Sequence, residues 1–159
     1  ENNYINAVYY HNKKIYAANR VDLQIIENNK VSSTFFYGDK NLFNYVYHIT
    51  SINNIIFLGT NKGLFKLSNN IFSPITNTSE INVINEDIYT SFQSKNNIFF
   101  GGKSGLYQFK NDSISIVKNS PKASVYNIIE YKNHLTLLLK MGFTKFQKIN
   151  TNLLAVDKE

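Results

Sequence analysis

The chain has 159 residues, a formal net charge of +6 and no cysteine. This length predicts one domain, the charge is too modest to indicate nucleic-acid binding by itself, and the lack of cysteine excludes disulfides and thiolate metal sites. The 11 tyrosines and 12 phenylalanines favour strands over helices, and no apolar run approaches the ~20 residues that a membrane-spanning helix needs.

One sequence pattern recurs along the chain and is clearest in residues 57–67, FLGTNKGLFKL, and residues 99–109, FFGGKSGLYQF. It fits twice more, at residues 16–26 and 136–146. Each of Ile15, Ile56, Ile98 and Leu135, which directly precede the four copies, has a branched apolar residue ten positions before it. These residues are Ile5, Val46, Ile88 and Val125. We therefore predict four consecutive units, at about residues 1–42, 43–82, 83–123 and 124–159.

The second unit predicts four short strands, with apolar runs at residues 45–52, 55–60, 64–67 and 71–75. Asn53 and Asn54 separate the first two runs, and such asparagine-rich connections are typical of two-residue hairpin turns. Pro74 places the last run at an edge of its sheet. The third unit repeats this order, with Asn96 and Asn97 as its first turn.

Small residues recur at two places in the units. Gly59 and Gly101 come late in the second run, where neighbouring sheets are expected to crowd, and Ala18 occupies the matching position. A second set follows the turn after that run, where a positive φ or a bulge is expected: Asp22, Gly63, Gly105 and Gly142. The large side chains of Phe57 and Phe99 are expected to fill the space between sheets.

Four antiparallel strands in about 40 residues, repeated in tandem, predict an all-β fold: a β-propeller of about four four-stranded blades in a single domain. A blade leaves one face bare unless a neighbour covers it. The chain is therefore part of a larger propeller, or two copies close one ring, or four blades close alone. The start at Glu1 and the short last unit favour the first arrangement.

The pattern resembles the regulator-propeller repeat, found in the extracytoplasmic sensor regions of hybrid two-component systems, notably of gut and marine Bacteroidetes. The copies at residues 57–67 and 99–109 carry the resemblance, and the other two are degenerate. The family usually has tryptophan where this chain has Tyr16, Phe57, Phe99 and Thr136. Such families commonly build seven-bladed rings, which implies that four units are part of a ring.

The resemblance also implies a function. It indicates a periplasmic, non-catalytic sensor segment of an inner-membrane protein. That segment would relay the binding of an oligosaccharide, through a following β-sandwich and a membrane helix, to a histidine kinase or transcription factor. A homodimer would form through the parent protein, and the membrane would be reached only through flanking segments.

A cation is predicted in the turn between the second and third strands of every unit: Arg20, Lys62, Lys103 and Lys140. Equivalent turns of propeller blades share one face, so these residues would form a partial ring of positive charge. The connections between units add Asp39, Lys40 and Lys122. Such a ring would attract carboxylated or sulfated ligands or an acidic partner surface, and Arg20 could hold a carboxylate in a bidentate pair. A solvated surface without a ligand is the alternative.

No catalytic set is visible in the sequence. His11 and His134 fall at the first hairpin turn of their units and His48 falls inside a first strand, so no spacing demands a metal site. Paired carboxylates and nucleotide-binding motifs are also lacking. We therefore expect neither catalysis by this segment nor a metal or other cofactor.

Aromatic side chains offer a second kind of ligand contact, because tyrosine rings can stack on sugar rings. The candidates are Tyr9, Tyr10, Tyr37, Tyr45 and Tyr47, with packing between strands as the alternative. Three functions stay open: the sensor segment, a stand-alone propeller scaffold that binds protein or glycan, and a propeller polysaccharide lyase or glycosidase. Nucleic acid is not expected as a partner.

Overall fold

The computed structural model describes residues 4–37, 42–76, 85–94, 97–131, 134–140 and 145–150. These residues form strands and turns and contain no helix, and consequently no helix that could cross a membrane. The described residues divide into two compact units. Unit 1 comprises residues 4–37, 42–76 and 85–88, and unit 2 comprises residues 89–94, 97–131, 134–140 and 145–150.

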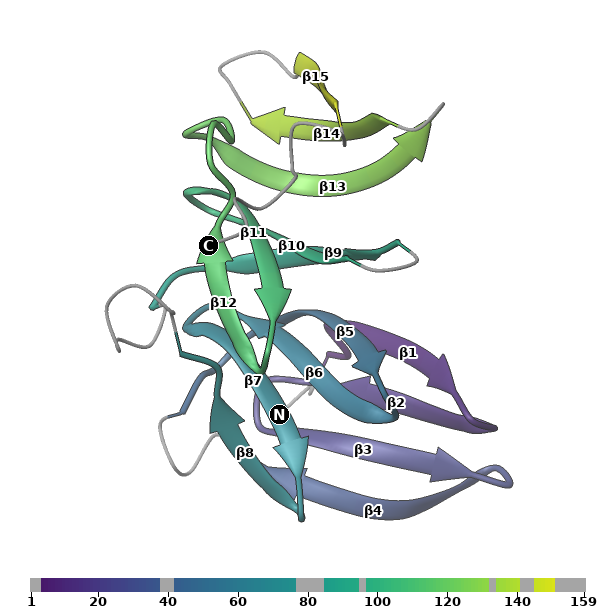
Figure 1. The fold of residues 1–159 in the computed structure, drawn as a ribbon. Coiled ribbons are helices and arrows are strands. Elements are labelled where there is room, and N and C mark those ends of the chain that lie inside the picture. Colours follow the sequence, from purple (N-terminus) through teal and green to yellow (C-terminus); the bar gives the residue numbers. More distant parts are fainter. Residues whose placement is uncertain are drawn as a thin grey trace. The chain divides into compact units, whose positions relative to one another are not determined.

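Unit 1 holds two four-stranded antiparallel sheets, in each of which every strand pairs with the next along the chain (Figure 1). The strands of the first sheet are β1 (Ala7–His11), β2 (Lys14–Ala18), β3 (Asp22–Glu27) and β4 (Lys30–Phe36). The strands of the second sheet are β5 (Val46–Ile52), β6 (Ile55–Thr60), β7 (Gly63–Ser68) and β8 (Ile71–Pro74). Strand β1 packs against β5, so the two sheets meet at their first strands.

Unit 2 repeats this design. Its first sheet contains β9 (Ile88–Gln93, with Ile88 counted in unit 1), β10 (Ile98–Gly102), β11 (Gly105–Lys110) and β12 (Ser113–Ile116). Its second sheet contains β13 (Ser124–Tyr131), β14 (His134–Lys140) and β15 (Lys145–Asn150). The predicted all-β chain of successive antiparallel blades is thus confirmed, and a fourth strand of the last blade falls outside the described residues.

The hairpin turns explain why asparagine replaces glycine so often in this chain. Pairs of consecutive residues with φ between 50° and 64° connect neighbouring strands at five places: Asn12-Lys13, Asn28-Asn29, Asn53-Asn54, Asn69-Asn70 and Asn111-Asp112. Two left-handed residues in a row are the mark of a type I′ turn, whose twist matches that of the flanking strands. The prediction of asparagine-built hairpins is confirmed at Asn53-Asn54, whereas Asn96 lies outside the described residues.

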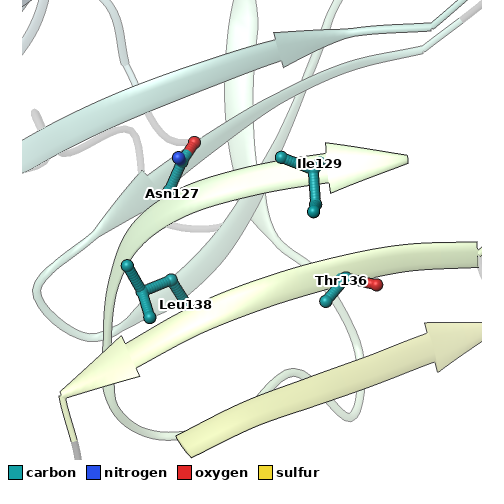
Figure 2. Close-up of a pocket in the computed structure, with 4 residues that line it drawn as sticks. All are labelled: Asn127, Ile129, Thr136 and Leu138. Atoms are coloured by element: carbon teal, nitrogen blue, oxygen red, sulfur yellow. The ribbon is translucent and has the colours of Figure 1, made fainter. Parts of the chain in front are cut away.

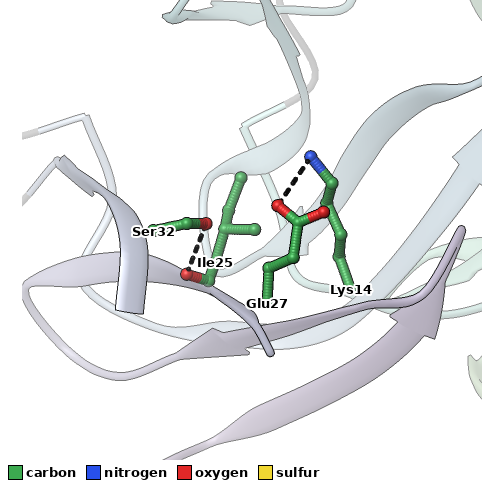
Figure 3. Close-up of polar contacts among 4 residues, drawn as sticks. All are labelled: Lys14, Ile25, Glu27 and Ser32. Atoms are coloured by element: carbon green, nitrogen blue, oxygen red, sulfur yellow. Dashed lines mark hydrogen bonds and ion pairs between the residues drawn. The ribbon is translucent and has the colours of Figure 1, made fainter. Parts of the chain in front are cut away.

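Irregular strand pairing occurs where β3 meets β4. The register shifts between Ile25 and Ile26, which leaves Ser32 as the extra residue of a bulge. The Ser32 hydroxyl donates a hydrogen bond to the Ile25 carbonyl at 3.1 Å (Figure 3). Lys14 and Glu27 form an ion pair of 3.4 Å between β2 and β3. Because both of these side chains are more than a third exposed, the pair adds little stability.

Small residues lie where the first strand of the next sheet approaches. A Cβ atom added to Gly101 would come 2.6 Å from the Val125 carbonyl oxygen at the start of β13. Within unit 1, one added to Gly59 would come equally close to the Ile88 carbonyl oxygen. Ala18, at the matching position of the first sheet, is fully buried. The predicted crowding late in the second strand is therefore confirmed.

Each unit has its own apolar core between its two sheets. In unit 2, Phe99 and Leu106 of the first sheet pack with Val125, Ile128 and three leucines of β14: Leu135, Leu137 and Leu139. This arrangement confirms that Phe99 fills the space between sheets. In unit 1, Leu23 of β3 and Tyr37, which directly follows β4, belong to one apolar cluster. The cluster also contains Phe43, Val46 and Leu58. Phe57 is also buried, with an exposed fraction of 2%.

The residues that follow the turn between the second and third strands differ in backbone conformation. Gly63 and Gly105 have φ of 106° and 146°, as predicted for glycine at this position. Gly142 lies outside the described residues. The expectation that Asp22 has a positive φ is wrong, because its backbone does not adopt the left-handed conformation. Its turn is instead held by the preceding Asn19.

Candidate functional site

Arg20 is presented by a rigid turn between β2 and β3. The Asn19 side-chain oxygen accepts hydrogen bonds from the backbone N–H groups of Val21, at 2.6 Å, and Asp22, at 2.8 Å. The Asn19 amide nitrogen donates to the buried Asp22 carboxylate at 2.8 Å. These contacts fix the backbone on both sides of Arg20, whose side chain is exposed.

Lys62 occupies the equivalent turn of the second sheet. Thr60 holds this turn, since its hydroxyl oxygen accepts from the Lys62 N–H at 3.1 Å and its hydroxyl donates to the Gly63 carbonyl at 2.8 Å. The Asn61 side-chain oxygen accepts from the Tyr45 backbone N–H at 3.1 Å, and the Asn61 backbone N–H donates to the Tyr45 carbonyl. The exposed Lys62 is therefore carried by a turn that is bonded to the entry of β5.

Lys103 occupies the same turn in unit 2 and is likewise exposed. Its backbone carbonyl accepts a hydrogen bond of 3.2 Å from the hydroxyl of Ser124, the first residue of β13. Lys122, two residues before Ser124, is also exposed. The part of unit 2 that the structure describes thus brings two exposed lysines to the start of β13.

The other predicted site residues are not brought into a site. Lys140 is the last residue of β14, paired in register with Ser124, rather than a turn residue. Asp39 and Lys40 lie outside the described residues. Arg20 and Lys62 belong to unit 1 and Lys103 to unit 2, so the ring of positive charge stays a prediction.

The tyrosines predicted to stack on sugars have different environments. Tyr37 is fully buried, with its hydroxyl within 2.6 Å of the Asn19 carbonyl and 2.9 Å of the Asp22 carbonyl. The expectation that it lies on the surface is therefore wrong. Tyr9 is half-buried and its hydroxyl is hydrogen-bonded to Ser51. Tyr10 is 68% exposed.

Both units hold a pair of tyrosine rings in contact, on or directly before the first strands of their sheets. In unit 1 the rings of Tyr45 and Tyr47 are 4.8 Å apart, centroid to centroid, and tilted by 44°. In unit 2 the rings of Tyr89 and Tyr126 are 4.6 Å apart and only 26° from parallel. Our sequence analysis missed the second pair. A signal was available in the sequence, because a tyrosine directly follows the recurring branched residue in three of the four repeats. The pairs are Val46-Tyr47, Ile88-Tyr89 and Val125-Tyr126.

Two of these tyrosines are the extra residues of β-bulges. Val46 and His48 pair with the consecutive residues Thr60 and Gly59, so Tyr47 is the extra residue on β5. The register shifts in the same way between Val125 and Asn127, which leaves Tyr126 as the extra residue. A bulge re-aims side chains relative to the regular alternation of a strand. The repeat thus places tyrosine where the backbone of the first strand is irregular.

The three histidines occupy different strands. The His11 ring is held by Ser51 and Asn54, with nitrogen–oxygen distances of 3.2 and 3.1 Å. Burial lowers the pKa of His48 in β5. His134 begins β14. Among the residues that the structure describes, no three histidine or carboxylate side chains lie close enough to hold a metal ion.

A small cavity of about 70 Å³ lies on the sheet of β13 and β14, lined by Asn127, Ile129, Thr136 and Leu138 (Figure 2). Its lining is largely apolar and comes from one sheet face. Ligand pockets usually measure at least about 300 Å³, so this cavity is too small for a sugar chain. Leu138 stands at the repeat position of Gly59 and Gly101, where the other sheets have small residues beneath a covering strand.

No protein-family model matches this sequence, and no curated protein sequence is significantly similar to it. Solved structures are similar in fold. The computationally designed Ika4 protein matches with a TM-score of 0.67 and 11% identity, over 94% of this chain and 93% of Ika4. The designed Ika8 protein matches with a TM-score of 0.62 and 12% identity, over 91% of this chain and 46% of Ika8.

The extracellular domain of BT4673 from B. thetaiotaomicron is also similar. Its two structures, described as a one-component and as a hybrid two-component system, match with TM-scores of 0.67 and 0.66 and identities of 14% and 16%. This chain is covered to 91% and 92%, and it spans 22% of that domain's length. The chain has the β-propeller fold, and its resemblance to the regulator-propeller repeat is supported at the level of the fold.

Proposed function

We propose that this chain is a ligand-sensing propeller segment from the extracytoplasmic part of a two-component or hybrid sensor, and that its ligand is an oligosaccharide. The observation that carries the proposal is the fold shared with the extracellular domain of BT4673. We place the segment in the periplasm of a bacterium, as part of an inner-membrane protein that includes a histidine kinase or a transcriptional regulator.

The segment performs no chemistry in this proposal. An oligosaccharide that binds one arrangement of a homodimer more tightly than another shifts the population toward the first arrangement. The parent protein passes that shift across the membrane. The rigid turns that carry Arg20, Lys62 and Lys103 suit such a role, because pre-ordered groups lose little entropy when a ligand binds.

The contacts that a carbohydrate needs support an oligosaccharide as the ligand. The paired tyrosines offer apolar ring faces, and exposed lysines offer hydrogen-bond donors and positive charge. Both kinds of group occur in each unit. A scaffold that binds protein through the same surfaces is the second candidate.

The proposal is tested on the whole protein as the cell makes it. We expect that the coding sequence continues into a membrane helix and a kinase or DNA-binding region. We also expect that a panel of acidic and neutral oligosaccharides contains at least one member that raises the thermal unfolding temperature in a dose-dependent way. A protein partner with no response to any saccharide would favour the scaffold and contradict the proposal.

A further inference from the structure

We propose that Tyr126, Tyr89 and Lys103 of unit 2 form a binding subsite for an acidic sugar, in which a pyranose ring stacks on Tyr126 and its carboxylate contacts Lys103. The inference rests on the proposed function, which it extends by naming the ligand class and the residues. The subsite combines Lys103, a cation singled out from the sequence, with the Tyr89–Tyr126 pair, which only the structure reveals.

The aromatic part of the subsite is a preformed platform. Tyr89 and Tyr126 come from neighbouring sheets, and their rings stack at 4.6 Å, 26° from parallel. Tyr126 is 39% exposed even though one face of its ring lies against Tyr89. A tyrosine ring supported in this way has few rotamers to lose when a sugar stacks on it, so binding costs less conformational entropy.

The bulge in β13 explains why Tyr126 is available. Its neighbour Val125 is fully buried in the apolar core, whereas Tyr126, the extra residue of the register shift, is not. The next residue, Asn127, is exposed, and its side-chain oxygen accepts from the Ile128 N–H at 2.8 Å. Its amide N–H groups are the natural donors to a sugar hydroxyl.

The cationic part lies at the same end of unit 2. Two contacts fix β13 on the end of β10: the close approach of Val125 to Gly101, and the hydrogen bond from Ser124 to the Lys103 carbonyl. The Lys103 backbone is therefore hydrogen-bonded to Ser124 of β13. Tyr126 follows Ser124 by two residues, which is a step of about 7 Å along the strand. The flexible four-carbon stem of Lys103 can direct the ammonium group toward a carboxylate on a ring stacked at Tyr126.

Unit 1 contains an independent example of the same combination. The turn that carries Lys62 is hydrogen-bonded through Asn61 to Tyr45, and the Tyr45 ring contacts that of Tyr47 at a tilt of 44°. Tyr47, like Tyr126, is the extra residue of a bulge. A lysine-bearing turn next to a tyrosine pair thus occurs in each unit, although the pairs are built from different strands.

The test uses a fluorescent variant of the whole protein. Because the chain has no tryptophan, Tyr126→Trp introduces a single one into this segment while it keeps an aromatic platform. We expect its emission to change on titration with oligogalacturonate, whereas Tyr4→Trp, at a tyrosine of unit 1 that is 73% exposed, gives no change. A response of both variants, or of neither, would overturn the subsite.

Affinities measured by calorimetry separate the contribution of the tyrosine platform from that of Lys103. We expect Tyr126→Ala to weaken the binding of oligogalacturonate and of its neutral methyl ester by about tenfold or more, as the loss of an aromatic stacking platform does for nucleic-acid bases. Tyr126→Phe should retain binding. Lys103→Gln should weaken the binding of the acid several-fold and leave the ester unchanged. Lys110→Gln, an equal charge change at the other end of β11, is the matched control.

The outcomes distinguish this subsite from the sensor function. If the wild-type protein binds a saccharide and neither Tyr126→Ala nor Lys103→Gln reduces the affinity, the subsite is wrong and the proposed function stands. If the ester binds as tightly as the acid, the acidic specificity is wrong. If the wild-type protein binds no saccharide, both proposals fail. Unfolding curves of each variant, matched to the wild type, exclude a loss of fold as the cause.

Discussion

Tyr37 was a candidate for sugar stacking in the sequence analysis, and the structure instead gives it a role in the core. Its ring packs 4.3 Å from that of Phe43, and its hydroxyl reaches two backbone carbonyls. Burial, together with the negative charge of Asp22, raises the pKa of Tyr37, so the hydroxyl stays protonated and can donate. Tyr37 thereby locks the turn that carries Arg20.

We expect Tyr37→Phe to lower the free energy of unfolding by about 1–2 kcal/mol, because the ring contacts remain while a buried carbonyl loses its donor. Chemical denaturation followed by circular dichroism measures this loss. Tyr10→Phe, at a tyrosine that is 68% exposed, is the control and should change stability by less than about 0.5 kcal/mol. Equal effects of the two variants would contradict the assigned role of Tyr37.

His48 makes stability depend on pH in a defined direction. Burial lowers its pKa in the folded protein, so below the unfolded value of about 6.5 the unfolded chain binds the proton more readily. Stability is then lost as the pH falls from about 6.5 toward the folded pKa. We expect wild type to lose more thermal stability than His48→Gln between pH 8 and pH 5. A parallel decline of the two proteins would show that His48 does not contribute.

At the scale of the strands, the spacing between sheets depends on residues without a side chain. Gly101 lies under the Val125 carbonyl oxygen, and the methyl group of Thr90 would be only 2.8 Å from an added Cβ. Neither neighbour is the end of a long flexible side chain, so the sheet of β13 must move to make room.

We therefore expect Gly101→Ala to destabilise the protein by about 1–3 kcal/mol, as overpacking of a core does. The measurement is the midpoint of urea unfolding, with Gln93→Ala at an exposed position of β9 as the control. A neutral or stabilising Gly101→Ala would mean that β10 and β13 do not approach as closely as the structure shows.

Hairpin turns are the elements that the sequence predicted best. The four runs expected at residues 45–52, 55–60, 64–67 and 71–75 form β5, β6, β7 and β8, and no strand end differs from its expected bound by more than about one residue. Asparagine pairs and short apolar runs encode such hairpins through interactions between close neighbours in the chain. The bulges at Tyr47 and Tyr126 carried no comparable local signal, because each arises from how a first strand fits its neighbours.

For the whole molecule, the formal charge of +6 gives a prediction that does not depend on one residue. If the ligand is acidic, its affinity should fall when the salt concentration rises from 50 to 500 mM, because mobile ions screen the exposed lysines. The affinity for a neutral ester should hardly change. Calorimetric titrations at both salt concentrations test this, and equal salt dependence for the two ligands would contradict electrostatic recognition.

The fold could be predicted at the level of the whole chain because its repeats are visible in the sequence. The candidate site could be predicted only in part. Three of the four turn cations were placed correctly in turns, Arg20, Lys62 and Lys103. The partner of those cations, the tyrosine pair of Tyr89 and Tyr126, was missed because its members are 37 residues apart in the chain.

By itself, the sequence determined the strand-and-turn order, the four repeats and the small residues late in the second strands, because each follows from local periodicity, turn chemistry or internal similarity. Only the tertiary structure decided which tyrosines are buried and which are presented. Tyr37 directly follows the end of β4, and Tyr126 lies near the start of β13. Tyr37 nevertheless lies in the core, whereas Tyr126 stacks on Tyr89 and is partly exposed. The physical reason is that burial depends on which distant strand packs over a side chain.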